Sequence, residues 1–394
     1  MAPESSTETY AQVYNRSLTD PEGFWADQAA GIPWIVAPKN ILDKDQNGVS
    51  RWFSDGVLNS CHVALDQHVA AGRGDQPALI YDSPVTGEIQ HFTYAQLLEK
   101  TAITAGGLVD LGVGKGDVVV IYMPMVPETV AAMLACARIG AIHSVVFGGF
   151  APKELAMRID DSNPRVVLAA SCGIEVDRVI AYQPLLNEAI DLAEHKPDHV
   201  VMLQRQQCEA TLSMPRDIDW HTWERQASPV DCVPVSATDP LYVLYTSGTT
   251  GKPKGIVRDN GGHAVALNYS MRAVYGVGVG DVYWAASDVG WVVGHSYIVY
   301  GPLFAGCTTV GYVGKPVKTP DAGAFWRVLA EHKVKSFFVA PTAFRAMRKE
   351  DPDCQLLQKY DISNLEYQFV AGERLDPSTS VSYTHLTLPT IFRV

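Results

Sequence analysis

Residues 245–255 read YTSGTTGKPKG, and this stretch follows an apolar, strand-like run at 241–245. Its glycines allow a tight turn and a close approach of the backbone to a ligand. Backbone N–H groups and hydroxyls in such a loop can bind phosphate oxygens, and lysines can neutralise the phosphate charge. We therefore expect a phosphate-binding loop at the end of a strand, formed by Thr246, Ser247, Gly248, Thr249, Thr250, Gly251, Lys252 and Lys254.

Two other interpretations of this loop account for fewer of its residues. A Walker A loop has four residues between its glycines and Ser or Thr after GK. Here two residues separate Gly248 from Gly251, and Pro253 follows Lys252, so the spacing disfavours a P-loop kinase or GTPase. A solvated hairpin or linker would not need hydroxyl, glycine and lysine residues together directly after a strand.

The rest of the chain alternates strand-like and helix-like segments. Thr93 and Gln96 form a capping-box pattern before one helix, and an alanine-rich helical pattern begins at Pro127. Continuous apolar strands between helices indicate parallel sheets buried on both faces. We expect one large α/β unit of stacked, mostly parallel sheets with flanking helices, preceded by irregular structure over residues 1–70. The predicted strands are 77–81, 117–124, 143–149, 164–170, 199–203, 240–247, 281–287, 308–313, 335–341 and 366–373.

The amino-acid composition and net charge exclude some classes of binding partner. The chain has 394 residues, of which 47% are hydrophobic and 19% charged, and this balance is typical of a globular protein. A formal net charge of −12 disfavours nonspecific nucleic-acid binding. Seven cysteines without a C-x-x-C pair indicate reduced thiols and no zinc knuckle. Without a secretory-signal pattern or a long apolar run, we expect a cytoplasmic protein with no membrane partner.

Four further segments share a family pattern with the loop: 122–152 (YMPMVPETVAAMLACARIGAIHSVVFGGFAP), 287–303 (SDVGWVVGHSYIVYGPL), 339–349 and 370–377. Together they resemble the adenylate-forming acyl-CoA synthetases, most closely the short-chain acetyl- and propionyl-CoA synthetases. The resemblance runs from about residue 10 to residue 376. It implies the large N-terminal domain of that fold, with a cap over residues 1–70 and an AMP-binding domain over 71–377.

The resemblance implies a reaction in two steps. A carboxylate attacks the α-phosphate of ATP to give an acyl-adenylate and pyrophosphate, and the thiol of coenzyme A then displaces AMP. Positioning and charge neutralisation dominate such phosphoryl chemistry. On this basis Thr246 and Lys254 are expected to be catalytic, and residues 246–252 to hold the ATP phosphates. Mg²⁺ is implied as a cofactor by ATP, and no metal-ligating residue of the chain is assigned to it.

The same resemblance assigns an acyl pocket to Trp291, Val292, Val293 and Ala371. Acetate-specific members usually carry Thr at the position of Val293 and Val at that of Ala371, so both residues favour propionate over acetate. One methylene is worth only about 1–3 kcal/mol in a pocket, so acetate is expected to remain a weaker substrate. An acetate–CoA ligase is the alternative. His295 is either a gate between the two steps or a buried structural histidine.

Two segments are assigned to the nucleotide and to coenzyme A. Gly372, Glu373 and Arg374, after Ala371, resemble the segment that lines the adenine. Residues 172–178 align with a segment that contacts coenzyme A, where other short-chain members carry R-G-G-K or R-G-G-R. Here that position reads Glu175, Val176, Asp177 and Arg178, of which Arg178 alone keeps the cationic role; a solvated turn is the alternative.

The family pattern ends after residue 377. Its small C-terminal domain, which carries a catalytic lysine, has no counterpart in this sequence. Residues 378–394 resemble translated sequencing-adapter read-through, so we expect a gene fragment or an assembly error. A non-catalytic nucleotide-binding fragment is therefore an alternative to a complete ligase.

Overall fold

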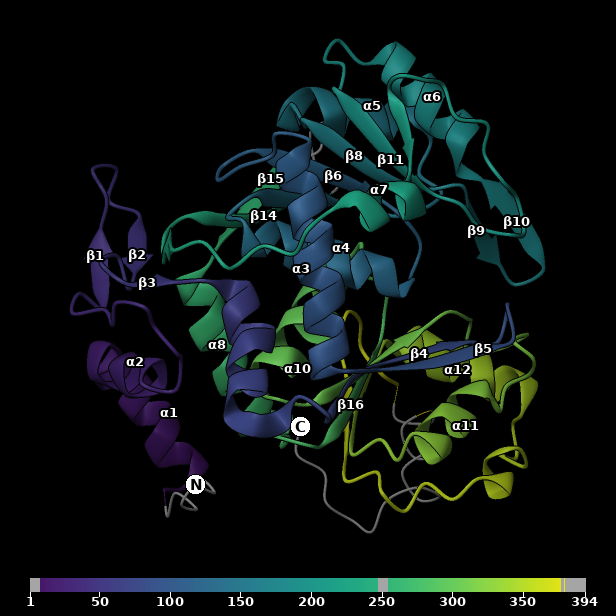
Figure 1. Cartoon of the computed structure of the whole chain (residues 1–394). Helices are drawn as coiled ribbons and strands as arrows, with labels where there is room; N and C mark the ends of the chain where they lie inside the picture. The colour runs from purple at the N-terminus through teal and green to yellow at the C-terminus, as the bar shows by residue number, and fades with distance from the viewer. Residues whose placement is uncertain (1–7, 247–253, 377–378, 380–394) are drawn as a thin grey trace.

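Two β-sheets lie one above the other with a layer of helices between them (Figure 1). The computed structural model describes residues 8–246, 254–376 and 379. Within that part of the chain, no helix combines the length and the apolar character needed to cross a bilayer. The arrangement confirms the expected α/β class with stacked, mostly parallel sheets.

The upper sheet in Figure 1 has seven strands, parallel except at one edge, where β15 runs antiparallel to β14. Its strands in spatial order are β12 (Asp217–Asp219), β11 (His199–Leu203), β8 (Val166–Ala170), β6 (Val118–Tyr122), β7 (Ile142–Val145), β14 (Pro240–Thr246) and β15 (Lys254–Asp259). Successive residues of one strand pack into different cores: Val119 faces the inter-sheet layer and Val120 the outer face. A strand buried on both faces has to be apolar throughout, which explains the unbroken runs in the sequence.

The lower sheet has six strands, again parallel except for one edge strand, β5. Its strands in spatial order are β19 (Tyr367–Val370), β18 (Ser336–Val339), β16 (Val282–Ala286), β17 (Thr308–Tyr312), β4 (Pro77–Ser83) and β5 (Glu88–Thr93). Alternate residues of its strands again pack into two different hydrophobic cores. Tyr283 packs toward the inter-sheet layer, whereas Trp284 packs on the outer face.

The layer between the sheets is built from helices that both sheets share. They are α3 (Tyr94–Asp110), α4 (Pro127–Arg138), α8 (Gly261–Ala273), α9 (Val292–Gly294), the π-helical turn η3 (His295–Tyr300) and α10 (Gly301–Phe304). Helix α3 begins with the predicted capping box: the backbone N–H of Gln96 donates to Thr93 Oγ1 at 3.2 Å, and that of Thr93 donates to Gln96 Oε1 at 2.9 Å. Both pairs satisfy donors that a helix start leaves free.

Two helix pairs cover the outer faces (Figure 1). Helices α5 (Pro152–Ser162) and α6 (Tyr182–Leu192) pack on the seven-stranded sheet, and α11 (Ala324–Glu331) and α12 (Pro341–Glu350) pack on the six-stranded sheet. Smaller elements complete this part of the fold. They are α7 (Trp220–Gln226), the two-stranded sheets β9 (Cys172–Glu175) with β10 (Arg178–Ala181) and β13 (Val235–Ser236) with β3 (Val57–Leu58), and the short helix η4 (Leu357–Lys359).

The expectation of irregular structure over residues 1–70 was wrong. This region forms α1 (Tyr10–Thr19), α2 (Pro21–Ala29), β1 (Leu42–Lys44), β2 (Ser50–Trp52), and the π-helical turns η1 (His62–Asp66) and η2 (Val69–Arg73). Helix α1 starts with a capping box between Thr9 and Gln12, and Asp20 caps α2. Caps mark the starts of both helices in the sequence, whereas the helices bury few side chains: α1 buries none, and α2 buries Phe24 and Ala29.

Candidate active site

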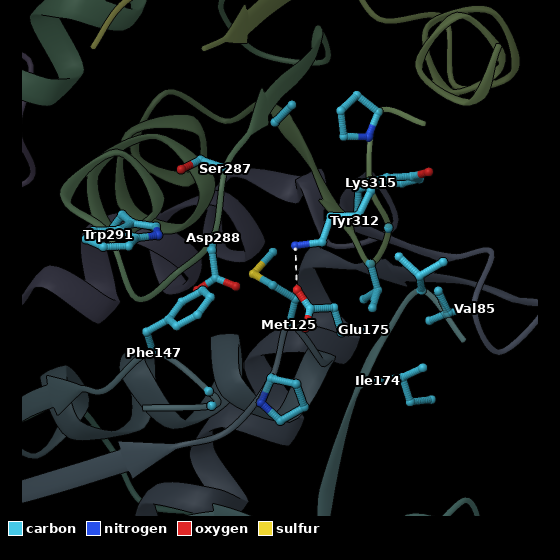
Figure 2. Close-up of a pocket in the computed structure, with 18 of the residues that line it drawn as sticks. Val85, Met125, Phe147, Ile174, Glu175, Ser287, Asp288, Trp291, Tyr312 and Lys315 are labelled. Carbon is cyan, nitrogen blue, oxygen red and sulfur yellow. Dashed lines mark ion pairs between the residues drawn. The ribbon is translucent and has the colours of Figure 1, made fainter. Parts of the chain in front are cut away.

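A cavity of about 640 Å³ opens where strands from both sheets end. Its wall includes residues that follow β6 and β7 in one sheet and β16, β17 and β18 in the other. Ligands in open α/β sheets bind at the carboxyl ends of strands, and this volume lies within the range of small-molecule pockets. We therefore take this cavity as the candidate site (Figure 2).

One wall is the turn between β16 and α9. Asp288 Oδ1 accepts the backbone N–H of Gly290 at 2.8 Å, and the carbonyl of Asp288 accepts that of Trp291 at 3.0 Å. The Trp291 indole is half exposed and leans against Phe147, with ring centroids 5.8 Å apart. Both rings border the cavity and present an apolar surface beside the Asp288 carboxylate (Figure 2).

The opposite wall is the β9–β10 hairpin together with the segment after β17. Glu175 lies 3.6 Å from Lys315 Nζ and 3.3 Å from Arg178 Nη2, and all three line the cavity. The Glu175–Lys315 pair spans from the hairpin to the six-stranded sheet (Figure 2). Because Glu175 and Lys315 are about half exposed and Arg178 is mostly exposed, each pair contributes at most about 1 kcal/mol to stability. The pairs place two cations and one anion at the rim.

Asp288 is the acidic group on the Trp291 side of the cavity. Burial by the surrounding chain raises the pKa of its carboxyl, while the N–H of Gly290 and the charge of Lys315 act in the opposite direction. A carboxyl with a raised pKa beside a cation is a common feature of functional sites.

The hairpin turn carries backbone strain. Val176 adopts a φ of +59°, which a β-branched residue rarely tolerates, in a two-residue turn that pairs Arg178 with Glu175. The resembling synthetases carry glycine at this position, and glycine adopts positive φ without strain.

Replacing Val176 with glycine is expected to stabilise the fold by about 1 kcal/mol. Relief of strain is worth about 1–3 kcal/mol, and the added glycine costs about 0.5–1 kcal/mol of entropy. The midpoint of urea denaturation measures the change. Val179→Gly, in the extended strand β10, is the control and is expected to lower the midpoint. A lower midpoint for Val176→Gly than for the wild type would contradict the strain.

Residues 247–253, most of the predicted phosphate-binding loop, lie outside the described residues. Its flanks are described: β14 ends at Thr246, β15 begins at Lys254, and these two residues pair directly in the antiparallel register. Both side chains are exposed. The predicted strand before the loop is therefore confirmed, and the two residues expected to be catalytic lie side by side.

The residues expected to form the acyl pocket are separated. Trp291 lines the cavity, but Val292, Val293 and Ala371 are not part of its wall. Val293 packs partly buried against the inter-sheet core, Val292 is exposed, and Ala371 is exposed just after β19.

His295 lies behind the Trp291 turn and is fully buried. Its Nδ1–H donates to the carbonyl of Trp291 at 3.0 Å, and its ring stacks on His143 with centroids 5.4 Å apart. Burial lowers the pKa of His295 to about 4, so the ring is neutral at pH 7. In this position it holds the Trp291 backbone.

The segment expected to bind adenine is exposed and does not line the cavity. Gly372 has a φ of +99°, a conformation that favours glycine. Arg345 of α12 holds the segment, with Nη1 donating to Glu373 Oε2 at 2.7 Å and Nη2 donating to the carbonyl of Arg374. Of the segment expected to contact coenzyme A, Glu175, Val176 and Arg178 line the cavity and Asp177 does not.

Sequence reasoning missed Asp288, Lys315, Phe147 and Tyr182, which all line the cavity. Two of them could have been found from their position in the sequence, because Asp288 follows β16 and Lys315 follows β17, both at carboxyl ends of strands. Tyr182 has no such signal. Its hydroxyl lies where side chains at Gly148 and Gly173 would have to go, so two glycines make room for it.

The mostly parallel double-sheet fold, with its cavity at the strand ends, is of the α/β class in which ligands bind at the carboxyl ends of strands. A model of the AMP-binding enzyme family matches residues 66–389, and one of the acetyl-coenzyme A synthetase N-terminus matches residues 10–64. The chain belongs to the AMP-binding enzyme family. The match extends past residue 377, where we expected the pattern to end, so the boundaries 1–70, 71–377 and 378–394 stay predictions.

Three relatives are similar in sequence to most of this chain. The chain is 53% identical to human acyl-CoA synthetase short-chain family member 3, mitochondrial, over 94% of its own length and 54% of that protein's. It is 44% identical to propionate–CoA ligase of Salmonella typhimurium, over 94% of the chain and 59% of the ligase. It is also 60% identical to an uncharacterised protein of Pseudomonas aeruginosa, with coverage of 94% and 59%. The chain therefore spans a little over half the length of these curated relatives.

Proposed function

We propose that the protein activates a short-chain carboxylate with ATP to an acyl-adenylate and transfers the acyl group to coenzyme A, with propionate preferred over acetate. Membership of the AMP-binding family supports the adenylation step, and relatives named as short-chain acyl-CoA synthetase and propionate–CoA ligase support the substrate class. Two predicted segments share one cavity, and this observation carries the proposal: the Trp291 turn for the acid and the β9–β10 hairpin for coenzyme A.

In this proposal each wall has a distinct task. The apolar surface of Trp291 and Phe147 takes the acyl chain and excludes water from it, while Lys315 and Arg178 attract the anionic co-substrate at the rim. Lys254, paired with Thr246, places a cation at the base of the phosphate loop. Holding both reactants in one cavity lowers the entropic barrier to reaction.

Mg²⁺ is not assigned to residues of this site. The ion prefers oxygen ligands, usually one or two carboxylates together with phosphates. In the described part of the cavity, Glu175 is paired with two cations, and the pKa of the partly buried Asp288 carboxyl is raised because the surrounding chain desolvates it. The one cluster of three metal-type ligands among the described residues is Cys61, Asp66 and Cys232, which do not line the cavity. The described residues do not fit the ion, and no step is derived through it.

The substrate preference rests on the family resemblance at Val293 and Ala371. A cytoplasmic location is likewise proposed from the reduced cysteines, although several relatives are named as mitochondrial. The partners that we propose for the protein are small molecules.

The first half-reaction is measured by exchange of labelled pyrophosphate into ATP. We expect exchange that depends on added acid, with a kcat/KM for propionate about 10-fold above that for acetate, in line with the value of one methylene in an apolar pocket. Equal or faster exchange with acetate would contradict the preference. Absence of exchange with propionate, acetate and butyrate alike would contradict the ligase activity itself.

A further inference from the structure

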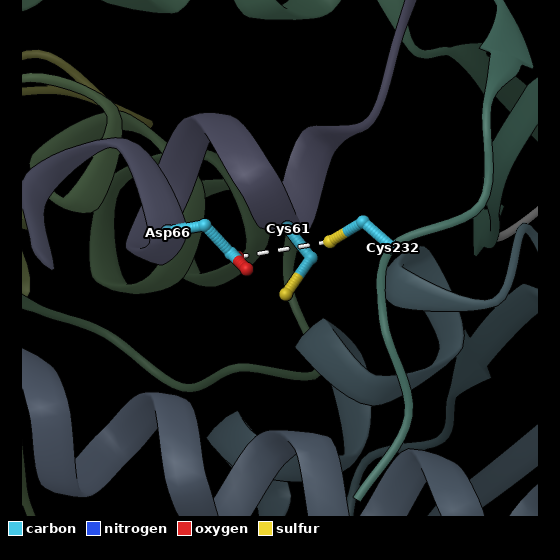
Figure 3. A group of neighbouring side chains, drawn as sticks. All are labelled: Cys61, Asp66 and Cys232. Atoms are coloured by element: carbon cyan, nitrogen blue, oxygen red, sulfur yellow. Dashed lines mark hydrogen bonds between the residues drawn. The ribbon is translucent and has the colours of Figure 1, made fainter. Parts of the chain in front are cut away.

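Cys61 and Cys232 come together in a polar cluster away from the cavity. Their sulfurs and a carboxylate oxygen of Asp66 all lie within 4.8 Å of one another (Figure 3). Cys61 precedes η1, and Cys232 lies on the segment between α7 and β13. The two thiols therefore connect parts of the chain that are far apart in sequence.

A guanidinium nitrogen already occupies the position of a cation in this cluster. Arg138 Nη1 lies 3.5 Å from Cys61 Sγ, 3.1 Å from Cys232 Sγ and 2.9 Å from Asp66 Oδ2. Burial opposes the charge of Arg138, but Cys61, Asp66 and Cys232 together raise its pKa, so it stays charged. A metal ion would have to share this space with a fixed positive charge, which disfavours a metal site.

The closeness of the two thiols is set by the backbone. The side chain of Asn59 accepts the backbone N–H of Cys61 at 2.9 Å and donates to the carbonyl of Val233, next to Cys232, at 2.8 Å. The N–H of Val233 in turn donates to the carbonyl of Arg138 at 2.9 Å. One buried amide thus holds both cysteine-bearing segments, and rotation about the side-chain bonds is the movement that remains between the sulfurs.

The cluster gives the two sulfurs different properties. Cys61 is fully buried, whereas Cys232 is partly exposed, so the pair is reached from the side of Cys232. Hydrogen bonding to Cys61, together with burial, raises the pKa of Cys232, and its thiol donates to Asp66 Oδ2 at 3.7 Å. Arg138 Nη1 lies beside both sulfurs and stabilises negative charge that develops on either of them.

We propose that Cys61 and Cys232 form an oxidation site that closes to a disulfide with hydrogen peroxide as the oxidant. One of the two thiols, beside Arg138, releases its proton, and the thiolate attacks one peroxide oxygen. The O–O bond breaks, and the departing hydroxide takes up the released proton, giving a sulfenic acid and water. The sulfur of the other cysteine then attacks the sulfenic sulfur, the S–O bond breaks, and the hydroxyl leaves as water with the proton of that second thiol. Two thiols and one peroxide give one disulfide and two waters.

Peptide mapping after peroxide treatment tests the proposal. The reduced, desalted protein is treated with hydrogen peroxide, quenched and digested without reductant. We expect a Cys61–Cys232 cross-linked peptide, loss of two of the seven thiols, and reversal of both by dithiothreitol. The cross-link is also expected to raise Tm, because it restricts the unfolded chain.

Matched variants separate this site from general oxidation. Cys208→Ser removes the other partly exposed thiol and is expected to leave the cross-link unchanged. Cys61→Ala and Cys232→Ser are each expected to abolish it. Because the wild type is mapped directly, the result does not depend on how well either variant folds. Oxidation of Cys208 without a Cys61–Cys232 cross-link would overturn the proposal, as would stoichiometric zinc in the purified wild type that Cys232→Ser loses.

Discussion

Replacing Gly294 with alanine is expected to lower acid-dependent activity by about 100-fold or more. A Cβ at this position would lie 2.0 Å from the carbonyl oxygen of Asp288 and 2.5 Å from Val289 Cα, both of them backbone atoms. The turn that carries Asp288 and Trp291 would have to shift, and a displacement of about 1 Å in an active site can cost 100-fold. Pyrophosphate exchange and urea denaturation together measure the effect.

Gly278 supplies the control for this substitution. A Cβ there meets no atom within 4 Å, so Gly278→Ala is expected to leave both activity and stability near the wild type. Overpacking at Gly294 is expected to cost about 1–3 kcal/mol of stability in addition to the activity loss. A Gly294→Ala protein with wild-type exchange would show that the Trp291 turn does not position the acid.

Replacing Asp82 with alanine is expected to destabilise the fold by about 3–5 kcal/mol, the usual cost of breaking a buried ion pair. Asp82, at the end of β4, is 1% exposed and accepts two hydrogen bonds from Arg327 of α11, at 2.7 and 2.9 Å. His332 Nε2 lies 2.6 Å from the same carboxylate. Alanine would leave the mostly buried Arg327 without this partner. Urea denaturation at pH 7 measures the loss.

Asp82 is also expected to make the stability of the fold depend on pH. Burial opposes the charge of Asp82, but hydrogen bonds from His332 and Arg327 outweigh it and lower the pKa of the carboxyl. A lowered folded-state pKa means that this stabilisation is complete above the unfolded value, about 4, and is lost as pH falls through the folded value. The stability difference between wild type and Asp82→Ala should therefore shrink below about pH 4.

Glu331→Ala provides the comparison for Asp82. Glu331 also pairs with Arg327, at 2.6 Å, but its side chain is 49% exposed. An exposed pair of this kind contributes about 0–1 kcal/mol. An Asp82→Ala protein that loses no more stability than Glu331→Ala would contradict the role assigned to the buried carboxylate.

The parts of the fold that could be predicted are those whose sequence pattern lies entirely within one strand or one helix. The strand at 199–203 was predicted with the bounds of β11, because a strand buried on both faces must be apolar throughout. All the strands that pair only in antiparallel register were missed: β1, β2, β3, β5, β9, β10, β13 and β15. Strand β5 is mostly exposed and β9 is only partly apolar, so neither has a continuous run. Their pairing depends on partners that a local pattern does not contain.

The candidate site could be predicted only in part for a related reason. The Trp291 segment and the β9–β10 hairpin were each found from motifs, yet the sequence does not say that they face one cavity. That relation arises from the stacking of two sheets. Lys315 and Asp288 have no distinctive motif, and their importance comes from where β17 and β16 end. For Val293 and Ala371, the motif predicted a shared pocket, but the two residues lie outside the wall of the cavity.

A crystal structure with the propyl ester of AMP, an unreactive analogue of propionyl-adenylate, is the most direct test of the proposed acyl site. We expect the propyl group to lie against Trp291 and Phe147, in the cavity whose opposite rim is formed by Glu175 and Lys315. Binding of the propyl group anywhere outside this cavity, with Trp291 uncontacted, would contradict it.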